Sequence, residues 1–492
     1  MTTSRRTFLS AAGSAAVGMV LGGCTSSRPQ EETSPTEQVP ELPGTGKPTN
    51  TGTERDQQMG RLPGEFLLGF ATAAYQIEGA VNEDGRGRSI WDEFCERPGA
   101  IDDGKSGAVA CDHYHRMPAD VDLMARLGTQ TYRFSVAWPR VYPDGRGRLN
   151  SKGLDFYQRL IDRLRHHNIS PMATVYHWDL PQALQDEGGW QERDCTSWFA
   201  DYAATLFERL DGVDRWVTIN EPRVIVRSGH QIGTMAPGIK SDRAAGKVIH
   251  HLALAHGKAV QAFRASGRSA DIGLCCAAVP CYPADDSEEA AEQAALGDAW
   301  INTTYLDPVL KASYPALRSK FPRGARQGLD VVDRDGDLAT ATQPLDFIGI
   351  NYYSPEIFDR NGATVVKYPT SSSGQQIHAD GFYDIVTRIH RDYSRPIVIT
   401  ENGIPDYPKR SAIDDDFRIE FLADHLRALQ RAMATGVPIR GYHAWSLMDN
   451  FEWARGFTQR WGLVRTDFRT QHRTLKKSAT WFANLIESRS LD

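Results

Sequence analysis

The sequence contains no long basic run, and its 492 residues carry a formal net charge of only −6. Nucleic acid is therefore not expected as a partner, because phosphate backbones bind to clustered lysine and arginine. No pair of cysteines has the spacing of a zinc ribbon, so a structural zinc site is not predicted. The composition, 40% hydrophobic and 24% charged, is that of an ordinary globular protein.

The first 24 residues lack an apolar run that is long enough for a comfortable transmembrane helix. The stretch "SRRTFL" from Ser4 to Leu9 holds twin arginines, and an Ala- and Gly-rich stretch follows, which resembles a twin-arginine export signal. "LGGC" at Leu21–Cys24 resembles a bacterial lipobox, whose cysteine is lipidated and becomes the new N-terminus. We therefore expect export and a lipid anchor on Cys24 at the outer face of the cytoplasmic membrane. The alternative is a plain signal peptide and a secreted protein.

Residues 25–61 contain almost no apolar side chains and are rich in Pro, Thr, Ser, Gly and Glu. Such a segment cannot bury enough surface to order itself, so it is interpreted as a disordered linker. Residues 62–492 show no linker, repeat or change of composition and are predicted to form one domain. Within it a disulfide is permitted outside the cytoplasm, and Cys95–Cys111 is the candidate pair by proximity. The sequence does not decide the oligomeric state.

Eight apolar, β-branched or aromatic runs recur along this domain, at 66–71, 131–136, 171–176, 215–220, 271–276, 346–351, 396–401 and 440–446. Helical patterns lie between them, as at 153–167, 248–263 and 418–436, where apolar residues recur at steps of three and four. Strands that alternate with helices indicate parallel pairing, and eight such units predict a (β/α)₈ barrel. A doubly wound sheet is disfavoured because no Gly-rich phosphate loop follows an early strand.

In such barrels, the catalytic groups lie at the carboxyl ends of the strands. The predicted fourth and seventh strands end on carboxylates, Glu221 and Glu401. A carboxylate pair suits glycoside hydrolysis, where one group protonates the departing oxygen and the other attacks the anomeric carbon or activates water. The donor needs a raised pKa, and the nucleophile needs a cation or hydrogen-bond donor beside it, for which Arg133 and Tyr353 are candidates.

A metal site is not expected at this rim, because the two carboxylates have neither a third acidic partner nor a His-rich ligand set. The cluster "CDHYHR" at 111–116 is interpreted as a packed His–Asp hydrogen-bond network rather than as a metal site.

Seven stretches together resemble glycoside hydrolase family 1. They are "FATAAYQIEGA", "YRFSVAWPRV", "VYHWDLPQAL", "TINEP", "GINYYS", "IVITENG" and "WSLMDNFEW". They occur in the family's order and span Leu62 to about Phe482. The resemblance implies a retaining β-glucosidase on a (β/α)₈ barrel, with Glu221 as general acid/base and Glu401 as nucleophile. It also implies a carboxyl separation of roughly 5–5.5 Å.

The same resemblance supplies expected roles for the remaining rim residues and implies no cofactor. Asn220 matches the residue that contacts the sugar 2-hydroxyl, and Trp445 matches the platform under the ring. Tyr353 and Arg133 match the groups that steer the nucleophile, with Asn351 beside them. The residues that match those holding the other hydroxyls of the glycone, the sugar that is released, are Gln76, His177, Glu452 and Trp453.

Three positions depart from the family pattern: Arg223, His230 and Leu68. Two interpretations of Arg223 remain open. It could lower the pKa of Glu221 or bind the aglycone (the leaving group), or it could be a surface arginine paired with a loop acid. A preference for 6-phosphorylated sugars is not expected, because Glu452 would repel a phosphate and Gln459 and Trp461 stand where such enzymes have Lys and Tyr.

The leading hypothesis is a lipid-anchored extracytoplasmic β-glucosidase that acts on short β-glucosides or cello-oligosaccharides. Glucose is the expected glycone, with galactose or fucose also processed. A transglycosylase would use the same residues and is not separated from a hydrolase by sequence. A non-catalytic sugar-binding lipoprotein is the third hypothesis, which the presence of both glutamates disfavours.

Overall fold

The computed structural model describes residues 60–408 and 410–491. The predicted export signal, Cys24 and residues 25–59 of the predicted linker lie outside them. No helix in the described ranges is both long enough and apolar enough to cross a membrane.

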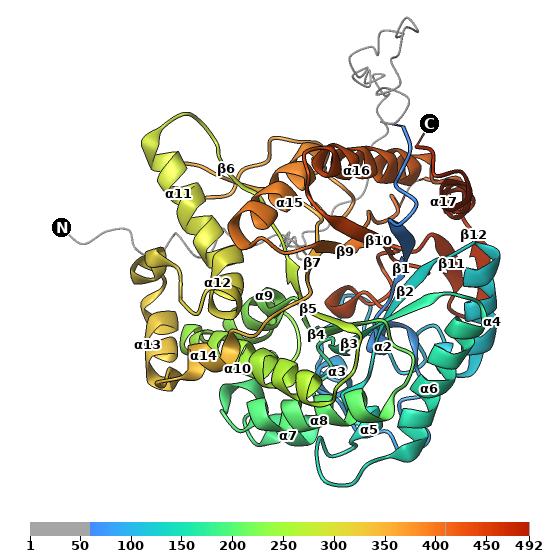
Figure 1. The fold of residues 1–492 in the computed structure, drawn as a ribbon, viewed down its shortest axis with the longest axis horizontal. Coiled ribbons are helices and arrows are strands. Elements are labelled where there is room, and N and C mark those ends of the chain that lie inside the picture. The colour runs from blue at the N-terminus through green and yellow to red at the C-terminus, as the bar shows by residue number, and fades with distance from the viewer. Residues whose placement is uncertain (1–59, 409, 492) are drawn as a thin grey trace, which may run out of the picture.

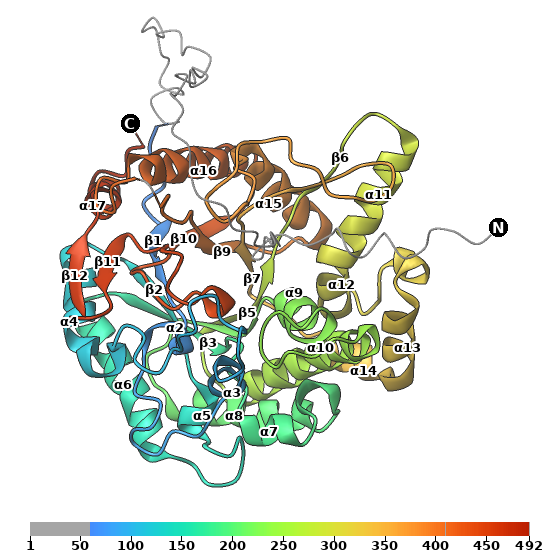
Figure 2. The same cartoon turned by 180° about the vertical axis from the view of Figure 1, so that it is seen from behind.

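Eight parallel strands close into a barrel at the centre of the molecule, with helices around it (Figures 1 and 2). The order around the barrel is β1-β10-β9-β7-β5-β4-β3-β2. The strands are β1 (Leu67–Ala71), β2 (Thr131–Ser135), β3 (Ser170–Tyr176), β4 (Arg215–Asn220), β5 (Asp271–Ala277), β7 (Phe347–Asn351), β9 (Ile397–Asn402) and β10 (Ile439–Trp445). Each overlaps one of the eight predicted runs, so the barrel prediction is confirmed and the doubly wound sheet is wrong.

The barrel interior is filled with side chains. Five buried residues, one from each of five neighbouring strands, form an apolar cluster of their own: Met172, Val217, Cys275, Phe347 and Val398. Such a layer makes the barrel a packed core rather than a pore, and leaves the strand ends as the place for polar groups.

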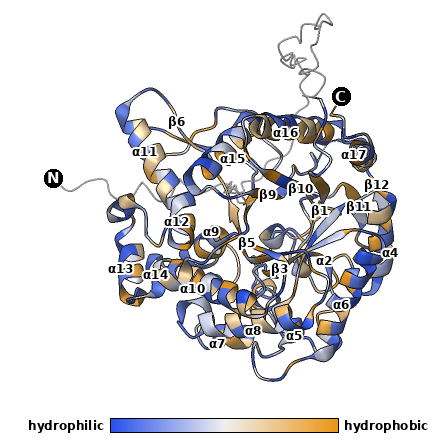
Figure 3. Ribbon diagram, viewed as in Figure 1, coloured by the Kyte–Doolittle hydropathy of each residue, from blue (hydrophilic) through white to orange (hydrophobic). Residues whose placement is uncertain are grey.

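The longer helices of the described residues bury one side and expose the other, and Figure 3 shows both hydrophobic and hydrophilic segments along them. In α6, the buried face includes Leu154, Leu160, Ile161 and Leu164, as the spacing predicts. The helices are α2 (Ala74–Ile77), α3 (Ile90–Cys95), α4 (His113–Arg126), α5 (Trp138–Val141), α6 (Ser151–His166), α7 (Gln182–Asp186), α8 (Cys195–Arg209), α9 (Pro222–Val224), α10 (Asp242–Ala265), α11 (Glu288–Asp298), α12 (Thr304–Leu310), α13 (Arg323–Val332), α14 (Asp337–Ala341), α15 (Ala379–Tyr393), α16 (Asp416–Ala434) and α17 (Lys477–Ser488).

Shorter elements lie outside the barrel sheet. Two π-helices, η2 (Ile225–Gln231) and η3 (Ala299–Thr303), follow α9 and α11. Two small sheets pair β6 (Cys281–Pro283) with β8 (Glu356–Phe358), and β11 (Val464–Asp467) with β12 (His472–Leu475). The 3₁₀ turns are η1 (Gly189–Gln191), η4 (Ala316–Lys320) and η5 (Trp453–Arg455).

The candidate disulfide between Cys95 and Cys111 is wrong, because both thiols are free. Cys111 is buried, and its Sγ donates to the carbonyl oxygen of Asp449 at 3.1 Å. Cys95 lies 3.6 Å from the hydroxyl of Tyr75 instead. Proximity in sequence did not bring the two thiols together, because helix α3 and the following loop turn them toward different partners.

The prediction for residues 111–116 is confirmed in its main feature, a His–Asp network. Buried His113 Nδ1 lies 2.8 Å from Asp120 Oδ2, while His115 bonds Asp112 at 2.6 Å at the surface. Arg473 also donates to Asp120, so the carboxylate is already matched by a cation.

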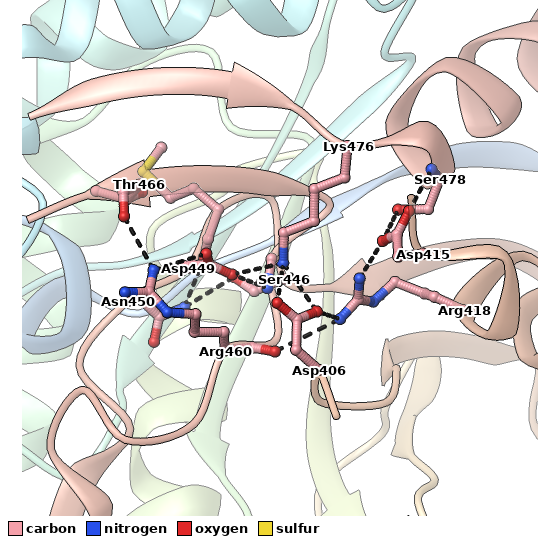
Figure 4. Close-up of polar contacts among 12 residues, drawn as sticks. Asp406, Asp415, Arg418, Ser446, Asp449, Asn450, Arg460, Thr466, Lys476 and Ser478 are labelled. Carbon is pink, nitrogen blue, oxygen red and sulfur yellow. Dashed lines mark hydrogen bonds and ion pairs between the residues drawn. The ribbon is translucent and has the colours of Figure 1, made fainter. Parts of the chain in front are cut away.

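A buried network of charges packs between the loop after β9, the loop after β10 and the start of α17 (Figure 4). Lys476 is fully buried, and its Nζ lies 2.9 Å from both Asp406 Oδ2 and Asp449 Oδ1. Arg460 contacts the other oxygen of Asp449, while Arg418 pairs with Asp406 and Asp415. Every cation here faces a carboxylate, which offsets the desolvation that isolated buried charges would suffer.

We predict that Lys476→Met lowers the free energy of unfolding by about 3–5 kcal/mol, because it leaves two carboxylates buried around a neutral side chain. Urea denaturation of the purified domain measures the change. Lys477→Met is the matched control, since Lys477 is exposed and its ion pair with Asp416 contributes at most about 1 kcal/mol. Equal losses in the two variants would contradict this assignment.

Candidate active site

A pocket opens at the carboxyl ends of the barrel strands, where most of the predicted rim residues lie together. Those that line it are His177, Glu221, Asn351, Tyr353, Glu401, Trp445, Glu452 and Trp453. Gln76, Arg133 and Asn220 are buried and not part of the lining. Arg133 and Asn220 contact the lining residues Glu401 and His177, whereas Gln76 contacts Asn450 and Phe451, which precede Glu452 in the chain. Cys24, the remaining predicted site residue, lies outside the described residues.

Glu401 lies near the end of β9 and is held by two donors. Arg133, fully buried on β2, donates from Nη1 to Glu401 Oε1 at 2.6 Å. The hydroxyl of Tyr353 donates to Oε2 at 2.7 Å. Burial raises the pKa of Glu401, while the guanidinium and the phenol act in the opposite direction by stabilising the anion. Both carboxylate oxygens are thereby fixed in direction.

Glu221 follows β4 directly and has weaker partners. Its backbone adopts a left-handed conformation with φ of 46°, which turns the chain before Pro222. The side-chain amide of Asn351 donates to Oε1 at 2.8 Å. Burial, and then the negative charge of Glu401, raise the pKa of Glu221 to about 8. At neutral pH this carboxyl therefore holds a proton that it can donate.

Asn220 and Asn351 connect the two carboxyl groups. Arg133 Nη2 and Asn351 Nδ2 both donate to Asn220 Oδ1, at 2.7 and 3.2 Å. The amide of Asn220 donates to His177 Nε2 at 3.1 Å, which leaves the ring proton of His177 on Nδ1. Burial and the charge of Arg133 lower the pKa of His177 well below its usual range, so the ring is neutral.

Several buried polar atoms around this pocket have no partner within the described residues. They include Gln76 Oε1, His177 Nδ1 and Glu452 Oε2. Gln76 is fixed by its other end, because Nε2 donates to Asn450 Oδ1 and to the carbonyl of Phe451. Buried polar groups are normally satisfied, so these atoms are suited to a ligand that carries several hydroxyl groups.

Glu452 adds a third acidic group to the same pocket. Burial, together with the charges of Glu401 and Glu221, raises its pKa to about 8. Ionisation of all three neighbouring carboxyl groups is therefore unfavourable in free energy, and a further negative charge placed among them would be unfavourable as well.

Aromatic rings form part of the pocket lining. Trp445 lies at the end of β10, and its ring is nearly parallel to that of His177, with centroids 6.1 Å apart. Trp453 packs on His177 at 5.8 Å and on Trp178 at 4.7 Å. Flat apolar rings beside hydrogen-bonding groups suit the C–H face of a sugar.

The three off-pattern residues have different surroundings. Arg223 lines the pocket and is buried, and its Nη2 lies 2.8 Å from Glu356 Oε1, so it is not a surface arginine. His230 is buried, with Nδ1 2.9 Å from the carbonyl oxygen of Ile225. Leu68 is buried in β1, away from the lining of the pocket.

Some residues of the site were not selected from the sequence. Trp178 lines the pocket and donates from Nε1 to the carbonyl of Asn220 at 2.9 Å. Trp461, considered only for phosphate, lines it too and meets Tyr353 edge-on. Thr400 donates to Asn351 Oδ1 at 2.6 Å and orients that amide. Trp178 could have been found by its place beside His177, whereas nothing local marks Thr400.

A group with metal-like spacing lies away from the pocket, at His250, Asp333 and Asp337. Arg193 already pairs with Asp337, and His250 Nε2 lies 2.8 Å from the same carboxylate. The positive charge that a metal would supply is therefore present in protein side chains. None of the three residues lines the pocket.

Residues 58–491 match the family model described as glycosyl hydrolase family 1. The chain belongs to glycosyl hydrolase family 1. The predicted family is thereby confirmed, and the chain is a glycosidase.

Curated proteins and solved structures are similar to this chain over most of their length. The chain is 44% identical to beta-glucosidase A of Acetivibrio thermocellus, covering 87% of this chain and 98% of that one. It is 40% identical to a 1,4-beta-D-glucan glucohydrolase of Thermotoga neapolitana, covering 88% and 100%. The family 1 b-glucosidase of Thermotoga maritima, solved with isofagomine lactam, is 39% identical with a TM-score of 0.83, covering 88% and 99%.

We predict that Arg223→Met moves the alkaline limb of the pH profile of kcat/KM to higher pH. Glu221 must be protonated to donate, so activity falls as the pH rises through its pKa of about 8. Arg223 lowers that pKa by its charge, and its removal therefore raises it. Initial rates on an aryl β-glycoside between pH 5 and about pH 10 measure the limb. Arg223→Lys, which keeps the charge, should leave the limb in place; a shift in both variants, or in neither, would contradict the assignment.

Proposed function

We propose that this glycosidase is a β-glucosidase that hydrolyses terminal β-D-glucosyl residues with retention of configuration. One observation carries the proposal: Glu221 and Glu401 line one pocket, and one hydrogen-bond network gives them different partners. Glu401 faces a guanidinium and a phenol, which favour its anion. Glu221 has one neutral amide and a raised pKa, which favours its acid form.

In the first step, Glu401 attacks the anomeric carbon while Glu221 protonates the departing glycosidic oxygen. The C–O bond to the aglycone breaks, its electron pair goes to the oxygen that receives the proton of Glu221, and an ester forms between Glu401 and the sugar. Arg133 and Tyr353 hold the carboxylate so that one oxygen can approach the carbon. The phenol stays protonated, because burial and the charge of Glu401 raise the pKa of Tyr353 well above its usual range.

In the second step, Glu221 is ionised and acts as a base. It removes a proton from a water molecule, the water oxygen bonds to the anomeric carbon, and Glu401 leaves as a carboxylate. Loss of the charge on Glu401 in the intermediate lowers the pKa of Glu221, since that charge is one of the causes that raise it. The same coupling therefore gives Glu221 an acid form before the ester forms and a base form afterwards.

The glycone is proposed to bind through Gln76, His177, Asn220, Glu452 and Trp453, over the ring of Trp445. The unpaired atoms of Gln76, His177 and Glu452 supply acceptors and a donor for hydroxyl groups. A 6-phosphate is disfavoured, because burial and the charges of the neighbouring carboxyl groups already penalise a negative charge at Glu452, and a phosphate there would face the same penalty. Relatives named beta-glucosidase support glucose as the released sugar.

We predict that substitutions of the two glutamates differ in how their effect depends on the leaving group. Glu401→Gln should lower kcat by about 10³-fold or more on every β-glucoside, because no nucleophile remains. Glu221→Gln should lower it by about 10²–10⁴-fold on alkyl glucosides. With 2,4-dinitrophenyl β-glucoside, the dinitrophenolate leaves without being protonated. The first step of Glu221→Gln is therefore retained on this substrate, and the glycosyl-enzyme accumulates.

Initial rates and intact-protein mass spectrometry measure these effects. A mass increase of one glucosyl unit is expected in Glu221→Gln and not in Glu401→Gln. The reverse pattern would exchange the two roles, and wild-type rates in Glu401→Gln would refute the mechanism.

We further propose that the protein is exported by the twin-arginine route and anchored by a lipid on Cys24. The support is the sequence: twin arginines at Arg5 and Arg6, a short apolar stretch, and "LGGC" ending at Cys24. The segment up to residue 61 would then tether the barrel to the membrane surface.

Expression of the full chain in a bacterium with this export route tests the anchor. The mature protein should begin at Cys24 with a lipid mass, and Cys24→Ala should release it from the membrane fraction. Lys at both Arg5 and Arg6 should retain the precursor inside the cell. An unlipidated N-terminus in the wild type would refute the anchor.

A further inference from the structure

The pocket has a second set of charges beyond the catalytic glutamates. The chain that follows Glu221 enters α9 and the π-helix η2, and from it Arg223, Arg227 and Ser228 line the pocket. Because this segment begins at the proposed proton donor, it lies on the side from which the aglycone departs. The apolar side chains Ile232 and Met235 continue the same wall.

The two arginines on this wall differ in how their charge is matched. Arg223 is buried and paired with Glu356 at 2.8 Å. Arg227 is half-buried, and no side-chain hydrogen bond or ion pair joins it to another residue in the described parts of the chain. Arg455, which also lines the pocket, differs again, because its Nη1 lies 2.8 Å from Asp102 Oδ2.

An unmatched guanidinium in this place is unfavourable for the free enzyme. Burial, and then the charge of Arg223, lower the pKa of Arg227 to about 10, so that it remains a cation at neutral pH. A half-buried cation beside a like charge has lost part of its hydration, and the carboxylate whose charge acts on it, Glu356, is already paired with Arg223. A negatively charged ligand group would restore that interaction.

We propose that Arg227 binds the carboxylate of an aromatic acid that forms the aglycone. The guanidinium offers a planar fork that matches a carboxylate. Ile232, Met235 and Trp178 supply apolar surface for the ring that carries it. This assignment rests on the proposed β-glucosidase function and names its substrate class.

The charge balance of the wall favours a monoanion. Arg223 is offset by Glu356, whose buried Oε2 has no partner among the described residues, so Arg227 supplies the one unmatched cation of this trio. A dianion such as a phosphate ester would face that oxygen and the carboxyl groups of Glu221 and Glu401. A neutral sugar aglycone would leave Arg227 uncompensated. A single carboxylate compensates the charge of Arg227 and adds only one negative charge to the pocket.

Two isosteric substrates test the proposal: 4-carboxyphenyl β-D-glucoside and its neutral counterpart, 4-carbamoylphenyl β-D-glucoside. The measured quantity is the ratio of their kcat/KM values, in which losses shared by both substrates cancel. The wild type should favour the carboxylate, and Arg227→Met should lower the ratio about tenfold, the effect of a charge-assisted hydrogen bond. Arg227→Lys should keep part of the preference, and 1 M salt should reduce it.

Arg243→Met is the matched control, because Arg243 is an exposed arginine in α10 that does not line the pocket. It should keep the wild-type ratio. An unchanged ratio in Arg227→Met would overturn the proposal while leaving the β-glucosidase function intact. If neither glucoside is hydrolysed, the proposed function fails, and calorimetric affinities of Glu401→Gln for the two compounds decide the carboxylate preference separately. Equal affinities would overturn it.

Discussion

One guanidinium sets the electrostatics of the whole site. Arg133 is fully buried on β2, and it reaches Thr174 on β3, Asn220 on β4 and Glu401 on β9. A buried cation is tolerated only where carboxylates and carbonyl groups surround it, and buried carboxylates likewise need a cation. The barrel meets both needs by bringing its strand ends to one ring. The strands place Glu401 and Asn220, and the hydrogen bonds from Arg133 orient their side chains.

The asymmetry between the two glutamates follows from that contact. Arg133 and Tyr353 occupy both oxygens of Glu401, whereas Glu221 receives only the amide of Asn351. When two buried carboxyl groups share a site, the proton stays on the one with the weaker stabilisation of its anion. The network therefore selects an acid and a nucleophile from two chemically identical side chains. Asn351 is itself oriented by Thr400, one residue before Glu401, so the strands fix the choice.

The strands and the rim residues could be predicted because their signals are local. The runs at 215–220 and 396–401 are rich in apolar and β-branched residues, Glu221 follows the first and Glu401 ends the second, and strand ends meet on one side of a barrel. Contacts between distant segments could not be predicted. From the sequence, Lys476 cannot be distinguished from the exposed Lys477 beside it, yet it is buried against Asp406 and Asp449. The disulfide failed for the same reason: sequence proximity says nothing about where Cys95 and Cys111 point.

The two ends of the pocket are stabilised in different ways, and this bears on specificity. On the glycone side, Glu452 and Trp453 belong to a loop whose Asp449 is held by Lys476 and Arg460 (Figure 4). Asn450 Oδ1 in the same loop accepts a hydrogen bond from the amide of Gln76. Moving one of these groups would disturb a buried network of charges, so the position of this loop is tightly constrained. On the aglycone side, Arg227 has no such partner within the described residues, and its replacement removes no side-chain hydrogen bond or ion pair there. The recognition of the sugar is therefore tied to the stability of the barrel, whereas the recognition of the leaving group can change independently.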